Sequence, residues 1–219
     1  MPVTTPAAVP ADAPARAGPV GDVDVPAVRR SVGVGDNDPL VLFVGRLTWQ
    51  KGPDLLMGAV PEVQRHRGDA KFVFVGDGDM RSSLEGQAGA AALFSSVRFL
   101  GTRSGPDLVG LFKSADVVCV PSRNEPFGIV VLEAWSATRP VVVTCNGGPR
   151  EFVRDQETGW VVEPNRQSLG WALGNQAGRE ATSGGQKINM LAYVVWSAMF
   201  AVPPLLILSL LLTFGLALV

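Results

Sequence analysis

The sequence predicts a doubly wound α/β domain with a parallel sheet, followed by an apolar segment that crosses a membrane. Short, almost wholly apolar runs such as LVLFV at residues 40–44 and KFVFV at residues 71–75 end in glycine, as strands buried on both faces of a parallel sheet do. A helical pattern follows each run, so strands and helices alternate along the chain. Residues 188–219 carry no charged side chain, which is typical of a membrane-spanning segment.

The predicted elements follow one another in a regular order. Strands are expected at residues 40–44, 71–75, 97–100, 116–120, 140–144 and 160–162. Helices are expected at residues 53–64, 79–92, 105–114 and 167–173, and a further helix opens at Phe127 and Gly128. Ligands bind to doubly wound sheets at the carboxyl ends of the strands. The motifs described below all follow a predicted strand, which places them at that edge.

Composition divides the chain into four parts. Residues 1–39 begin with a stretch of Pro, Ala, Val, Thr and Gly that cannot build a core, and they predict a disordered or linker arm. Residues 40–175 form the predicted α/β domain, residues 176–187 a polar linker, and residues 188–219 the hydrophobic segment. The formal net charge of −1 gives no argument for nucleic-acid binding.

The domain is organised around SRNEPFGIVVLEAW at residues 122–135, in which Glu125 and Glu133 lie eight positions apart. Phe127 and Gly128 open a helix between them, and the free backbone N–H groups at such a start bind anions. Glu133 is expected about two turns into the helix, roughly 12 Å beyond Glu125. This spacing predicts a site for a long polyhydroxylated ligand with a negative middle. The alternative is a pair of carboxylates on an ordinary amphipathic helix.

A second motif, GRLTWQKG at residues 45–52, leaves the first predicted strand. Arg46 offers a planar fork of donors and Lys51 a point charge, and the two together suit neighbouring phosphates. The segment lacks the spacing of a Walker phosphate loop. The alternative is two solvated cations on a surface loop.

Together, SRNEPFGIVVLEA and GRLTWQKG resemble the E-x7-E signature and the G-R-L-x3-K-G segment of the retaining glycosyltransferases of family 4, also called group 1. Those enzymes have the GT-B fold of two Rossmann-like domains. The resemblance covers residues 39–175 and implies a single Rossmann-like domain, the donor-binding half, which takes a nucleotide-diphosphate-sugar. The acceptor-binding half is not expected in this chain, so efficient transfer by the chain alone is not expected.

The resemblance also implies roles for individual residues. Glu125 contacts the donor sugar, while Arg46 and Lys51 clamp the diphosphate and stabilise the leaving group; these are the implied catalytic residues. Glu133 holds the ribose hydroxyls. The other implied binding positions contact the ligand through the backbone or line its base, and they are Gly45, Leu100, Phe127, Gly128, Gly147 and Gly148.

The implied reaction retains the anomeric configuration through front-face attack, with the diphosphate as its own base. The protein then supplies mainly positioning and charge stabilisation. The resemblance implies no cofactor and no metal ion, because the nucleotide-sugar is the donor substrate itself. The acceptor is not readable from the sequence.

The apolar segment at residues 188–219 predicts membrane association, with the α/β domain on the cytoplasmic side. Thirteen of the last twenty residues are Leu, Ile, Val or Phe. The stretch INMLAYVVWSAMFAVPPLLILSLL also resembles one span of EamA-type drug/metabolite transporters. Alternatives to an enzyme are therefore a transporter fragment fused to a glycosyltransferase remnant, or a nucleotide-sugar-binding module without catalysis. For the segment itself, the alternative is a buried core helix.

Overall fold

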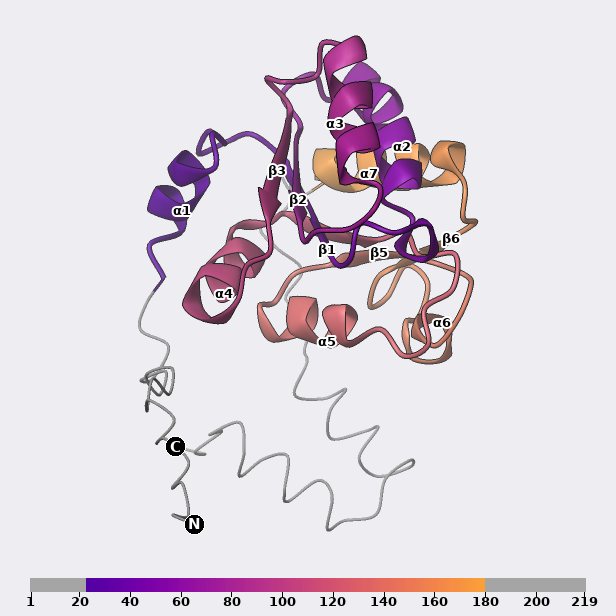
Figure 1. Cartoon of the computed structure of the whole chain (residues 1–219). Helices are drawn as coiled ribbons and strands as arrows, with labels where there is room; N and C mark the ends of the chain where they lie inside the picture. Colours follow the sequence, from indigo (N-terminus) through magenta and orange to yellow (C-terminus); the bar gives the residue numbers. More distant parts are fainter. Residues whose placement is uncertain (1–22, 180–219) are drawn as a thin grey trace, which may run out of the picture.

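The computed structural model describes residues 23–179, which form one α/β unit around a six-stranded sheet (Figure 1). The strand order is β3-β2-β1-β4-β5-β6, and each neighbouring pair is parallel. The strands are β1 Leu40–Val44, β2 Lys71–Val75, β3 Val97–Gly101, β4 Val117–Val120, β5 Val141–Thr144 and β6 Trp160–Val162. The predicted doubly wound parallel sheet is confirmed.

Apolar side chains of the central strands alternate between two cores, one on each face of the sheet. Val41 and Phe43 of β1 belong to one core, whereas Leu40 and Leu42 belong to the other. Successive side chains of a strand point to opposite faces, so a strand covered on both sides must be apolar at every position. This explains why the runs in the sequence are continuous rather than alternating.

Helices cover both faces of the sheet (Figure 1). On the first face, α2 Pro53–His66, α3 Arg81–Ala90 and α7 Arg166–Arg179 contribute Leu56, Leu84 and Leu169 to the core. The second face is covered by α4 Gly105–Ser114 and α5 Ile129–Ser136, with Leu111 and Trp135 in its core. The short elements are α1 Val25–Ser31, a 3-10 turn η1 Trp49–Lys51, and α6 Pro149–Phe152.

The linker predicted for residues 1–39 is wrong for part of its length, because α1 belongs to the folded unit. Asp24 caps this helix through its carboxylate, which accepts from the backbone N–H of Ala27 at 3.0 Å. Arg29 of α1 is buried and donates to the carbonyl of Ser114 at 2.7 Å and to that of Gly35 at 3.1 Å. It also lies 3.3 Å from Asp116, so α1 is tied to residues far along the chain.

The other end of the domain differs from the expectation as well. The structure continues α7 to Arg179, four residues into the predicted linker at residues 176–187. No helix within residues 23–179 is long and apolar enough to cross a membrane. The segment predicted to do so, residues 188–219, lies outside the described residues.

Candidate active site

The candidate site lies where the strand order reverses, between β1 and β4. The loop after β1, residues 45–52, leads into α2 on one face of the sheet. The loop after β4, residues 121–128, leads into α5 on the other face. These connections diverge at the carboxyl ends of the two strands, which is where open α/β sheets bind their ligands. The space between the two loops is called the crevice below.

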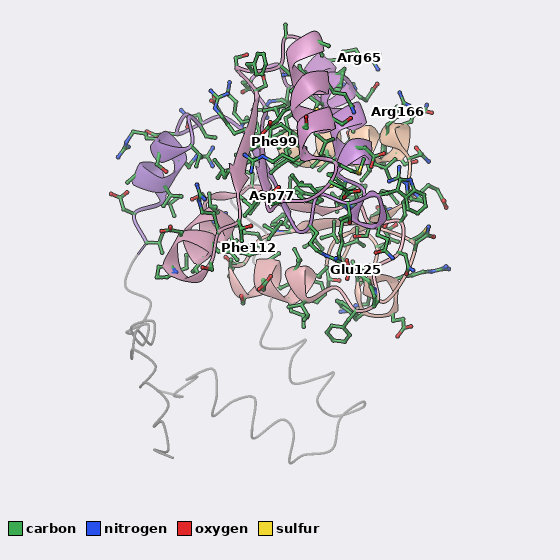
Figure 2. All side chains as sticks on the ribbon, viewed as in Figure 1. Arg65, Asp77, Phe99, Phe112, Glu125 and Arg166 are labelled. Atoms are coloured by element: carbon green, nitrogen blue, oxygen red, sulfur yellow. The ribbon has the colours of Figure 1, made fainter. Side chains whose placement is uncertain are left out.

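Lys51 and Glu125 meet across this crevice. The Lys51 Nζ lies 2.6 Å from the Glu125 Oε2, although the residues are 74 positions apart. The Ser122 hydroxyl donates to the same carboxylate oxygen at 3.1 Å. Glu125 is only 7% exposed, and its label in Figure 2 lies beside α5.

The loop after β5 supports Glu125 from its other side. The backbone N–H of Gly148 donates to the Glu125 carbonyl at 2.8 Å, and Glu125 pairs with Gly147 in an isolated parallel bridge. A β-carbon on Gly147 would lie 2.1 Å from the Glu125 carbonyl oxygen, and its φ is +106°. Only glycine fits this close backbone approach. The predicted positions Gly147 and Gly148 therefore do lie beside Glu125.

The helix α5 presents a free N-terminus at the same place. Gly128 is its N-cap, with φ +91°, and no side chain caps the helix. The backbone N–H groups of Phe127, Gly128 and Ile129 donate to no acceptor within residues 23–179. Free N–H groups at a helix start, together with the helix dipole, favour an anion.

Glu133 lies closer to this helix start than expected. Since α5 begins at Ile129, Glu133 is about one turn into the helix rather than two, roughly 6 Å along its axis. The residues before Ile129 form a loop, because Gly128 has a left-handed conformation that the helix cannot include. Burial raises the pKa of the half-buried Glu133 above its usual 4.5.

The remaining predicted positions lie on neighbouring loops at the same edge. The backbone N–H of Gly45 donates to the Val75 carbonyl at 2.9 Å, which aligns the ends of β1 and β2. Leu100 is half-buried near the end of β3, against the core beneath α4 and α5. Arg46 is exposed and forms no ion pair with another described residue. The structure thus joins Lys51 to Glu125 but leaves Arg46 outside that contact.

Sequence reasoning missed a second ion pair across the crevice. Arg123, in the loop after β4, donates to both carboxylate oxygens of Asp54 at 2.8 and 2.6 Å. The guanidinium also lies 4.7 Å from the centre of the Trp49 ring, which is 62% exposed. Arg123 is inside the SRNEPFG stretch, but nothing in the sequence pairs it with a residue 69 positions away.

Two further features of residues 23–179 bear on the chemistry. These residues contain no group of three or more His, Cys, Asp or Glu that could hold a metal ion. A hollow of about 580 Å³ also exists, and none of the predicted site residues lines it. Its lining comes from α2, β6 and α7, and from Glu163 between the last two.

Comparison with protein families places the chain in context. A family model described as "Glycosyl transferases group 1" matches residues 24–173. An uncharacterized glycosyltransferase of Methanocaldococcus jannaschii is 47% identical over 147 residues, which are 66% of this chain and 37% of the relative. The D-inositol 3-phosphate glycosyltransferase of Salinispora tropica is 36% identical over 167 residues, covering 70% of this chain and 34% of that enzyme.

Solved structures show the same architecture. HepE of Anabaena, crystallised with UDP and glucose, superposes with a TM-score of 0.69 and 28% identity, over 81% of this chain and 48% of HepE. A second HepE structure, at 26% identity and a TM-score of 0.61, contains UDP-glucose. The chain therefore spans about a third of the curated relatives above, at 37% and 34% of their lengths. The family model ends at residue 173, and the resemblance of the tail to a transporter span gains no support from these comparisons.

Proposed function

Since the chain belongs to the family of group 1 glycosyl transferases, we propose that its α/β domain binds a uridine diphosphate sugar and acts in transfer of the sugar with retention. The observation that carries the proposal is the Lys51–Glu125 pair at the point where the strand order reverses. Its Glu125 member lies in the loop that ends at the free N-terminus of α5. Uridine is chosen because HepE structures contain UDP and UDP-glucose.

In this proposal the diphosphate lies against the start of α5. The backbone N–H groups of Phe127 and Gly128 donate to phosphate oxygens, and the positive end of the helix dipole favours their charge. Lys51 adds a full positive charge from the opposite wall of the crevice, and Arg46 turns from solvent toward the same phosphates. Each charged hydrogen bond of this kind contributes about 1.5–3 kcal/mol.

In the proposal, one carboxylate binds the ribose end of the donor and another binds its sugar end. Glu133 accepts hydrogen bonds from the ribose hydroxyls, and Glu125 accepts from hydroxyls of the sugar. Glu125 is ion-paired with Lys51 in this structure, so the incoming phosphates and sugar hydroxyls share these two groups. The base lies by Leu100, and the sugar faces the turn at Gly147 and Gly148.

Transfer then breaks the bond between the anomeric carbon and the diphosphate oxygen, and the electron pair stays on that oxygen. A hydroxyl of the acceptor attacks the same face of the anomeric carbon, and its proton passes to the departing phosphate. Lys51, Arg46 and the helix N–H groups stabilise the charge that develops on the leaving diphosphate. We include no metal ion in the proposal, because these groups supply the positive charge.

The proposal is tested by calorimetric titration with UDP and with uridine. Lys51→Ala and Arg46→Ala should each weaken UDP binding about tenfold or more and leave uridine binding nearly unchanged. Lys71→Ala is the matched control, because Lys71 starts β2 at the opposite edge of the sheet. Equal losses for both ligands would show that the phosphates bind elsewhere, and loss of UDP binding on adding EDTA would show that a metal ion is required.

A further inference from the structure

Arg123 joins the two walls of the crevice more extensively than any predicted site residue. Its guanidinium binds the Asp54 carboxylate through two parallel hydrogen bonds, at 2.8 and 2.6 Å. The Nη1 nitrogen, which binds Asp54 Oδ1, also donates to the carbonyl of Trp49 at 2.8 Å. The backbone N–H of Arg123 donates to the carbonyl of Gln50 at 2.8 Å. One residue of the β4 loop thus holds two consecutive residues of the β1 loop and one residue in the first turn of α2.

These contacts surround the residues that are proposed to bind the donor. Lys51 directly follows the two carbonyls that Arg123 binds, and Glu125 lies two positions after Arg123. Gly52 completes the close approach, since a β-carbon there would lie 2.1 Å from the Pro121 carbonyl oxygen. The contacts of Arg123 and Gly52 therefore hold the two loops together beside the Lys51–Glu125 pair.

The ion pair between Arg123 and Asp54 is partly shielded from water and has a fixed geometry. The side chains of Arg123 and Asp54 are 19% and 26% exposed, so water screens them less than a surface pair. Burial acts to raise the pKa of Asp54, but the hydrogen bonds and charge of Arg123, with backbone hydrogen bonds, outweigh it and lower that pKa. A bidentate Arg–carboxylate contact also fixes orientation, which a lysine cannot do.

We infer that Arg123 and Asp54 are positioning residues for the donor site: their ion pair holds the Lys51 loop at the distance from Glu125 that the diphosphate requires. The inference rests on the proposed function, because it names the residues that keep that same site assembled. The Lys51–Glu125 contact must change when phosphates enter, whereas the Arg123–Asp54 pair stays closed. The Arg123–Asp54 pair thus keeps the width of the crevice constant while Lys51 and Glu125 exchange their contact for contacts with the donor.

The test is a double-mutant cycle on UDP binding with Arg123→Gln, Asp54→Asn and the double variant. We expect each single change to weaken UDP binding about tenfold, while uridine binding changes less than twofold. Because the two residues act as one unit, the double variant should lose no more than either single variant. The matched control is the Arg67–Asp69 pair, whose hydrogen bonds of 3.1 and 3.0 Å lie at the other end of α2. Arg67→Gln should leave UDP binding unchanged.

A second measurement needs no ligand. Backbone amides of residues 45–52 and 121–128 should exchange with deuterium faster in Arg123→Gln than in wild type or in Arg67→Gln. Folded Arg123 variants that bind UDP like wild type would overturn the inference, as would additive losses in the cycle. If wild type binds no UDP, the proposed function fails instead, and unchanged exchange in the two loops would then refute the positioning role separately.

Discussion

Glu125 and Glu133 are both carboxylates of one motif, but their surroundings differ. Glu125 is buried and paired with Lys51, whereas Glu133 is half-buried on α5 and forms no ion pair within the described residues. If Glu133 binds ribose, Glu133→Gln should weaken UDP and UDP-glucose alike, by about 1.5–3 kcal/mol. Glu125→Gln should spare UDP and weaken only UDP-glucose, because its proposed partner is the sugar. Four calorimetric titrations separate the two outcomes.

The control for this pair of variants is Glu157→Gln, an exposed carboxylate between α6 and β6. It should bind both ligands like wild type. If the two site variants also do so while remaining folded, Glu125 and Glu133 are structural carboxylates. The donor site would then lose its central support.

The raised pKa of Glu133 predicts how binding depends on pH. Because burial raises the pKa of Glu133 above its usual 4.5, the folded carboxyl keeps its proton at pH values where the unfolded one has lost it. The folded state therefore binds more protons than the unfolded state between the two pKa values. Glu133 therefore favours folding at low pH, and this contribution is lost as pH rises through the raised pKa. Ribose hydroxyls need the ionised form, so UDP binding should strengthen over the same rise. The measurement is the ratio of the UDP affinity of wild type to that of Glu133→Gln at each pH, in which the titration of the UDP phosphate cancels. This ratio should rise as Glu133 ionises, and a ratio that does not change with pH would contradict the prediction.

At the scale of elements, α1 is held by the packing of Val28 on the core and by the polar contacts of Arg29. Arg29 supplies donors to the carbonyls of Ser114 and Gly35, and it pairs with Asp116 at 3.3 Å. Arg29→Met should destabilise the domain by about 3–5 kcal/mol, because removal of one partner leaves buried groups unsatisfied. Arg30→Met on the same helix is the control, since its side chain is 62% exposed. Urea unfolding of both variants measures the difference, and equal midpoints would show that α1 is not held by Arg29.

The elements show which features the sequence could predict. Strands such as LVLFV were predictable because burial on both faces demands an unbroken apolar run. The position of both loops at the carboxyl edge of one sheet was predictable too. The direct contact between Lys51 and Glu125 was not predicted and comes from the structure. The helix α1 was missed because its contacts are distant in sequence: the Arg29 partners Ser114 and Asp116 lie 85 and 87 positions away. The Arg123–Asp54 pair was missed for the same reason, because local sequence patterns do not indicate hydrogen bonds between residues far apart in the chain.

At the scale of the whole molecule, the prediction concerns residues 188–219, which lie outside the described structure. This segment has no charged residue, and thirteen of its last twenty residues are Leu, Ile, Val or Phe. Each contributes about −0.3 to −0.6 kcal/mol to insertion, so together they favour the membrane by roughly 4–8 kcal/mol. We expect the full chain to sediment with lipid vesicles and residues 1–183 to remain in the supernatant. UDP titration of residues 1–183 should match that of the detergent-solubilised full chain, because the proposed site lies within residues 45–148. A full chain that stays in the supernatant with vesicles, monomeric and without detergent, would show that the segment packs on the protein instead.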